Sequence, residues 1–340
     1  MRRLSNVLVL AVAIALAACT SIWAQAISKR VMDDLLSIQS YRARIVERGM
    51  IPGDADAKLV REVTYQKLWK VRSEVKEPVE LAGQVAVFDG DTAIFWWPSQ
   101  LFGIRVRGLP VPSEKEARRH AERVTKEALR EYAFSMDGQF VLAGQPAARW
   151  KVIPLKRGPF RFPHDSWVHE RYSFPLKLAY YDEERLWYGM EFESLEFGVP
   201  AASDAFTLQF PPNAVVFDWD FSAPGISMEE ARRTMNFKVR VPKKLPEGHE
   251  VRKIVRGQHC LPMVTLLMDR DGTWISLAES RAMGGMEIAT GKKLKVGEEE
   301  AYLNFLGYDT VVSWSKGGTY LTLITNLPFQ DALSIAESVE

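Results

Sequence analysis

Alternation of apolar and polar residues with a period of two recurs along most of this chain and restricts it to a fold rich in β-sheet. The first such run places Tyr41, Ala43 and Ile45 on one side and Arg42 and Arg44 on the other. Because successive side chains of a strand point to opposite faces, this pattern predicts a strand with one buried face. Similar runs follow at short intervals, so we expect neighbouring strands to pair in antiparallel fashion.

Turn and cap residues divide these runs. Asp89-Gly90 separates Val85 to Phe88 from Thr92 to Trp97 and predicts a tight hairpin, because glycine accepts the positive φ that such a turn needs. Ser113, with Glu116 three residues later, predicts the start of a long polar helix. Shorter helices are expected over residues 28–38, 228–235 and 328–339, from apolar residues at helical spacing and, for the second, from Ser227 as N-cap.

The remaining strand patterns form two groups, before and after a segment that resembles a linker, Val215 to Gly225. The first group is expected to end with a strand between Pro200 and Pro212, where Phe206, Leu208 and Phe210 alternate. The other expected strands are Leu59 to Val75 with a break near Lys70, Phe140 to Leu142, Ala147 to Ile153, Trp167 to Tyr172, Leu176 to Asp182, Leu186 to Phe197, Val251 to Arg256, Met263 to Asp269, Trp274 to Glu279, Glu299 to Leu306, Asp309 to Lys316 and Thr319 to Thr325.

The N-terminus predicts export. Arg2 and Arg3 precede an apolar run from Val7 to Ala18, which is too short to span a bilayer and is typical of a cleaved secretory signal. The run ends in a sequence that resembles a bacterial lipobox, in which cleavage before Cys19 exposes a thiol for lipidation. An ordinary signal peptidase could instead cut after Ala26, at an A-x-A site. We favour the lipid anchor, and expect the protein in the periplasm or on the outer face of the cytoplasmic membrane.

Charge argues against one class of partner, and the cysteine count limits how the fold can be stabilised. The chain has 44 Lys plus Arg against 43 Asp plus Glu, and loss of Arg2 and Arg3 with the leader leaves 42 against 43, a formal charge of −1. Nucleic-acid binders usually carry a basic stripe, so no nucleic acid is expected as a partner. The second cysteine, Cys260, has no intramolecular partner once Cys19 is acylated or lost, so the fold must be stable without a disulfide.

Aromatic residues gather in two places. A site for an acyl chain needs a concave apolar surface and no catalytic group, and each buried CH₂ contributes about 0.8 kcal/mol. The alternative interpretation of both clusters is ordinary core, and only one of the adjacent Trp96 and Trp97 can point into a given cavity. The candidate lining residues are Phe95, Trp96, Trp97, Phe102, Trp187, Tyr188 and Phe192.

Catalytic and metal sites are not expected. His164, Asp165 and His169 could be combined with His259-Cys260 as a zinc site, but nothing in the sequence brings the two groups together. Cys260 next to His259 could be a nucleophile, yet neighbours in a strand point apart. The chain also contains no G-x-S-x-G, phosphate-binding loop or H-E-x-x-H. We therefore predict a non-enzymatic protein without cofactor or metal.

Several segments together resemble the Lol-type lipoprotein carriers. They are Val87 to Thr92 leading to Trp96-Trp97-Pro98, Pro175-Leu176-Lys177 followed by Asp182, and Phe206 to Phe210 before Pro211-Pro212-Asn213-Ala214-Val215. The resemblance covers about residues 27–216. It implies a strongly curved antiparallel sheet, an incomplete barrel around helices, whose concave apolar lining receives acyl chains of lipids or lipoproteins.

The C-terminal part resembles a small module that is fused to such carriers in lipoproteins of Gram-positive and related bacteria. The residues that carry this resemblance are Leu245-Pro246-Glu247-Gly248, Lys292 to Ala301, Val311, Ser313, Trp314 and Leu333 to Glu340. Periplasmic sigma-factor regulators of the MucB/RseB type share the two-domain arrangement, and in them the second domain contacts an anti-sigma factor.

The sequence therefore predicts an α+β protein with a curved N-terminal half-barrel and a smaller C-terminal α+β domain. The expected boundaries are a signal peptide over 1–26, the half-barrel over 27–216, a linker over 217–225 and the second domain over 226–340. The expected function is binding of lipid or lipoprotein acyl chains by a membrane-anchored protein. The alternative is an envelope-stress regulator that binds an anti-sigma factor or similar membrane protein through the second domain.

Overall fold

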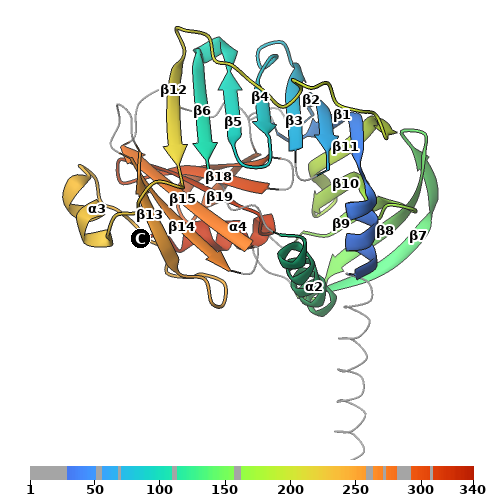
Figure 1. The fold of residues 1–340 in the computed structure, drawn as a ribbon. Helices are drawn as coiled ribbons and strands as arrows, with labels where there is room; N and C mark the ends of the chain where they lie inside the picture. Colours follow the sequence, from blue (N-terminus) through green and yellow to red (C-terminus); the bar gives the residue numbers. More distant parts are fainter. Residues whose placement is uncertain are drawn as a thin grey trace, which may run out of the picture.

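The computed structural model describes residues 29–50, 56–67, 70–108, 113–156, 162–257, 263–270, 273–281, 292–306 and 309–340. The expected leader with Cys19 and the pair His259-Cys260 lie outside these ranges. Two β-sheets and a few helices make up the described chain (Figure 1). None of the helices in this part is long and apolar enough to cross a membrane.

The first sheet has 12 strands in the order β12-β6-β5-β4-β3-β2-β1-β11-β10-β9-β8-β7. Neighbouring strands are antiparallel, except that β12 runs parallel to β6. The sheet curves from β12 round to β7 and stays open, which is the half-barrel expected from the sequence (Figure 1). Its strands are β1 Ser40–Arg48, β2 Lys58–Gln66, β3 Lys70–Glu77, β4 Val85–Phe88, β5 Ala93–Trp97, β6 Phe102–Arg107, β7 Tyr132–Leu142, β8 Gln145–Pro154, β9 His164–His169, β10 Pro175–Asp182, β11 Arg185–Phe197 and β12 Val215–Asp220.

The period-two pattern of β1 places its two kinds of side chain as predicted. Tyr41 and Ala43 are buried on the face that we call the inner face. Arg44 lies on the opposite, outer face, where it pairs with Glu77 and Glu193 at 2.6 Å each. A strand with one apolar face and one charged face can be buried on its apolar face only. The outer face of β1 therefore stays in solvent.

Local signals in the sequence are confirmed at the β4–β5 turn and at the long helix. Asp89 accepts hydrogen bonds from the N–H groups of Asp91 and Thr92 at 3.0 and 2.8 Å, and Gly90 has a φ of 104°. Helix α2, Glu114–Glu131, begins with the capping box of Ser113 and Glu116. A first helix spans residues 29–37, and a 3₁₀ turn, η1, covers Pro98–Gln100.

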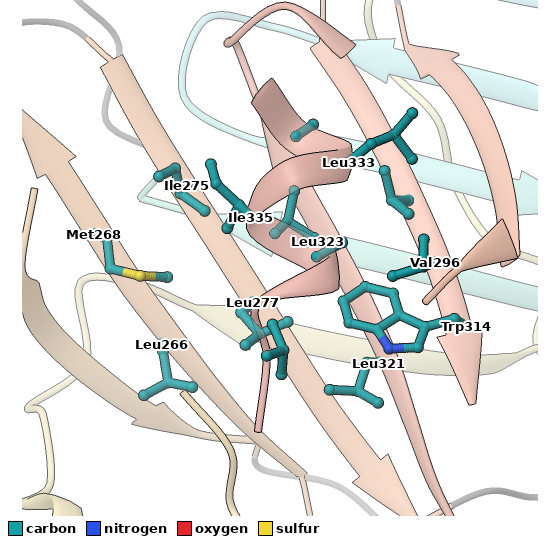
Figure 2. Close-up of a cluster of buried hydrophobic side chains, with 14 of the residues drawn as sticks. Leu266, Met268, Ile275, Leu277, Val296, Trp314, Leu321, Leu323, Leu333 and Ile335 are labelled. Atoms are coloured by element: carbon teal, nitrogen blue, oxygen red, sulfur yellow. The ribbon is translucent and has the colours of Figure 1, made fainter. Parts of the chain in front are cut away.

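The second sheet has seven strands in the order β13-β14-β15-β19-β18-β17-β16. One of its faces packs against helices α3, Met228–Thr234, and α4, Phe329–Glu337. Figure 2 shows part of this core, where Leu323, Leu333 and Trp314 come from two strands and a helix. Its strands are β13 Val251–Arg256, β14 Met263–Arg270, β15 Thr273–Arg281, β16 Lys292–Val296, β17 Glu299–Leu306, β18 Asp309–Lys316 and β19 Thr319–Thr325.

The first sheet contacts the C-terminal part of the chain at two places, both on the inner face of the first sheet. Phe95 of β5 packs on a cluster that includes Leu267 of β14. Further along the sheet, the ring of Trp187 on β11 stacks on Phe329 of α4 at a centroid distance of 5.5 Å. The second sheet therefore covers part of the inner face of the first.

Four segments differ from the sequence-based expectation. The strand expected between Pro200 and Pro212 is wrong: this segment pairs with no strand, and Phe206 and Phe210 instead pack on the outer face of β4 and β5. The chain then enters β12 at Val215, so part of the expected linker belongs to the first sheet. β16 was not expected, and β7 begins at Tyr132, eight residues before the strand that alternation indicates.

Candidate functional site

The aromatic residues of β5 divide between the two faces of the sheet. Phe95 and Trp97 share the inner face, with ring centroids 6.3 Å apart. Trp96 points to the outer face, where its ring lies 5.6 Å from that of Phe210. Of the two adjacent tryptophans, Trp97 is therefore the one that faces the second sheet.

Phe102 joins this group from β6. It is the register partner of Trp97, and the two ring centroids are 5.4 Å apart. Both side chains are half-buried. Phe95, by contrast, packs on a cluster formed by Phe221, Val255 and Leu267. The inner face of β5 and β6 thus changes from residues covered by the second sheet to residues that are partly open.

Trp187 lies between the two sheets. Its ring stacks on Phe162 at 4.6 Å as well as on Phe329, and the ammonium of Lys292 lies 5.4 Å from its centroid. Burial, with the charge of Arg185 nearby, lowers the pKa of Lys292. The protein's own aromatic rings, those of Phe162 and Phe329, therefore already pack against this indole.

Tyr188 and Phe192 are buried on the inner face at different points of β11. The hydroxyl of Tyr188 donates to Glu47 at 3.1 Å, and the same carboxylate accepts from Nε of Arg61 at 2.6 Å. Burial and the neighbouring Glu47 charge raise the pKa of Tyr188 well above its usual value. Phe192 packs in another cluster, 5.2 Å from the ring of Phe174.

The seven candidate lining residues therefore form several groups. Phe95, Trp97 and Phe102 lie together on the inner face, whereas Trp96 lies on the outer face. Trp187 and Tyr188 flank Tyr180 near α4. That any of them contacts a ligand stays a prediction.

An apolar surface that the sequence analysis missed lies on β7 and β8. Seven of the ten large apolar side chains that are exposed in the described part of the chain belong to this hairpin and the residue after it. The register pairs Met136 with Trp150 and Phe134 with Val152, and continues through His164 to Tyr180, so these side chains lie on the inner face. We call Phe134, Met136 and Trp150 the inner apolar patch. The seven residues are Phe134, Met136, Phe140, Val141, Trp150, Ile153 and Leu155.

The inner apolar patch had a weak signal in the sequence. Phe134 and Met136 are two residues apart, as are Trp150 and Val152, which is the spacing of one strand face. β7 begins at Tyr132, directly after the last residue of α2, so no turn signal separates the long helix from Phe134 and Met136.

The two histidines of β9 make separate local contacts. His164 stacks on Tyr180 at 4.5 Å on the inner face, and burial lowers its pKa. Nδ1 of His169 accepts the N–H of Arg171 at 3.0 Å and closes the turn after β9. Five residues apart on one strand, the two rings point to opposite faces. Among the residues that the structure describes, no group of three His, Cys, Asp or Glu side chains could hold a metal ion.

Comparison with known proteins adds similarities of overall structure. No protein-family model matches the chain, and no curated protein sequence is significantly similar to it. A crystal structure of MucB is 17% identical, covers 92% of this chain and 95% of its own, and gives a TM-score of 0.48. MucB in its complex with MucA from Pseudomonas aeruginosa is 16% identical, with 93% and 98% covered and a TM-score of 0.46. A LolA superfamily protein from Nitrosomonas europaea is 10% identical, with 89% and 96% covered and a TM-score of 0.21.

The similarity to each of these solved structures extends over most of this chain.

Proposed function

We propose that this chain is an exported, non-enzymatic protein, anchored by lipid at Cys19, that binds acyl chains of lipids or lipoproteins on the inner face of its curved sheet. The leader and the Lol-type resemblance of the sequence support export and ligand class. The observation that carries the proposal is the inner apolar patch, because Met136 is 62% exposed and Phe134 and Trp150 are also exposed on a concave face. Soluble proteins rarely leave a contiguous apolar surface open without a function.

The chemistry of the patch fits a flexible apolar chain. Each CH₂ of an acyl chain that leaves water contributes about 0.8 kcal/mol, so a chain needs no directed polar contact to bind. Methionine adapts its shape to an irregular ligand, and the indole of Trp150 offers a large flat contact. The half-buried Trp97 and Phe102 lie on the same inner face near the other end of the sheet and offer a second partly open apolar surface.

The test is the occupancy of the purified protein. Organic extraction followed by mass spectrometry should recover acyl species, and a fluorescent fatty acid should bind the delipidated protein. Met136→Glu places a carboxylate in the patch and should weaken that binding about tenfold or more. Val79→Glu is the matched control, because Val79 is 81% exposed on the turn between β3 and β4. A protein that is empty after purification and has no affinity for fatty acids would contradict the proposal.

The second candidate function is regulation through residues 226–340, with an anti-sigma factor or similar membrane protein as partner. The stacking of Trp187 on Phe329 favours it, because this contact joins the inner face of the first sheet to a helix of the second. A ligand on the first sheet could then alter the partner surface of the second. Co-purification of a membrane protein by the wild type, and its loss with Phe329→Ala while acyl binding is kept, would support regulation.

A further inference from the structure

The β7–β8 hairpin is apolar on both of its faces. Met136 and Phe134 lie on the inner face, as described above. Register pairs Ile153 with Ala133 on the outer face, where Ile153 is 54% exposed, and Leu155 follows two residues later. β7 is also the last strand of the sheet, so beyond it no strand of the described chain continues the ladder. Exposed apolar side chains therefore surround an edge of the molecule and do not form a single flat patch.

An edge of this kind fits a fluid apolar surface. A rigid protein partner covers one face of a strand pair, whereas the interfacial region of a bilayer can enclose both faces at once. Aromatic and aliphatic side chains that enter this region gain free energy in proportion to their buried apolar area. The exposed charges nearby have both signs, with Lys151 and Lys156 against Asp137 and Glu170, so the contact does not depend on anionic lipid.

The position of the first helix supports the same orientation. Residues 29–37 contact α2 and the turn after β9: Asp33 pairs with Arg118 of α2 at 2.6 Å, and Asp34 accepts from the hydroxyl of Ser173 at 2.6 Å. Leu35 packs against the same core cluster as Leu142, the last residue of β7. The ten residues from Cys19 to Ser28 span at most about 35 Å when extended. A lipid on Cys19 therefore keeps the start of the first helix within about this distance of the membrane.

From these observations we propose that the β7–β8 hairpin is a membrane-contact edge, which inserts Ile153, Leu155 and the rim of the inner apolar patch into the bilayer interface. The inference deepens the proposed function and rests on it for export and for the anchor. It gives acyl chains a route from the bilayer to the patch that does not cross water.

The experiment uses residues 27–340, the product of cleavage after Ala26, so that no covalent lipid contributes. Flotation with phosphatidylcholine vesicles, with and without phosphatidylglycerol, measures partitioning. The wild type should float equally well with both compositions. Ile153→Glu should lower the partition coefficient about tenfold, whereas Val79→Glu should leave it unchanged.

Fatty-acid binding of the same variants separates the two proposals. Ile153→Glu changes the outer face, so it should keep fatty-acid affinity while losing flotation. A wild type that binds fatty acid but does not float would overturn the membrane-contact edge and leave the proposed function standing. Equal flotation of Ile153→Glu and Val79→Glu would also overturn it. So would a dimer in solution that Ile153→Glu dissociates, because a second copy would then cover the hairpin.

Discussion

Replacing Glu279 by Gln should make this protein more stable at neutral pH and remove most of a decline in stability with rising pH. Glu279 lies on β15, is 0% exposed, and accepts the backbone N–H of Arg240 at 3.2 and 2.9 Å. The guanidinium of Arg240 points elsewhere and donates to Lys238 and Thr319. Burial raises the pKa of Glu279 from 4.5 to about 7, and the backbone hydrogen bond and the charge of Arg240 only partly oppose it.

The direction and the size of this pH dependence follow from the linkage between proton binding and unfolding. The folded state holds the Glu279 proton more tightly than the unfolded state, so the contribution is fully present below pH 4.5 and is lost as pH rises through about 7. A shift of this size corresponds to about 3 kcal/mol of unfolding free energy. Glutamine keeps an acceptor for the Arg240 N–H and carries no charge, so the stability of Glu279→Gln should lack this loss.

Urea unfolding followed by circular dichroism at pH 5 and pH 8 measures the difference. The wild type should lose about 2.5 kcal/mol more than Glu279→Gln between the two conditions. Glu300→Gln is the matched control, because Glu300 is exposed and its pKa is lowered by hydrogen bonds from Lys293 and Tyr302. Parallel pH profiles of the wild type and Glu279→Gln would refute the reasoning.

Three further substitutions test the packing of the first sheet. Gly103→Ala should release residues 198–214 from the outer face, because a Cβ at this position would collide with the ring of Phe210. Limited proteolysis should then cut this segment faster than in the wild type, and an unchanged rate would contradict the prediction. Trp187→Ala should cost about 3 to 5 kcal/mol by denaturant unfolding, since it removes the stacking on Phe329. Tyr188→Phe should cost about 1 to 2 kcal/mol, because a buried carboxylate loses a donor, and an unchanged midpoint would show that this hydrogen bond adds nothing.

Turns and helix caps, which depend on only a few neighbouring residues, were predicted correctly from the sequence. The Asp89-Gly90 turn, the capping box at Ser113 and the Ser227 cap of α3 all appear where the sequence places them. Such features depend on backbone conformation and on hydrogen bonds between near neighbours. They need no knowledge of the tertiary structure.

Signals that depend on distant contacts were misread. The alternation of Phe206, Leu208 and Phe210 predicts a strand, but the side chains are buried by the outer face of β4 and β5 and the backbone pairs with nothing. Alternation of apolar and polar residues shows which side of an extended segment is buried. It does not show whether the backbone of that segment pairs with another strand. In β16, the charges of Lys292 and Lys293 obscured an edge strand.

The candidate site was predicted only in part. The sequence identified aromatic residues on β5, β6 and β11, but the contact between Trp187 and Phe329 joins residues more than a hundred positions apart. The exposure of Met136 likewise depends on β7 being the last strand of the sheet. Neither property can be obtained from local pattern.

The parallel strand β12 has a mechanical consequence. The chain leaves it at Phe221, whose N–H donates to the carbonyl of Arg107 at 2.9 Å and whose carbonyl accepts from Lys253 at 2.5 Å. Tension applied to the C-terminal half therefore acts along the axis of β12. The hydrogen bonds between β12 and β6 are then loaded in shear, so they resist together and do not break one at a time. A pull on a partner held by that half would reach the curved sheet before the two halves could separate.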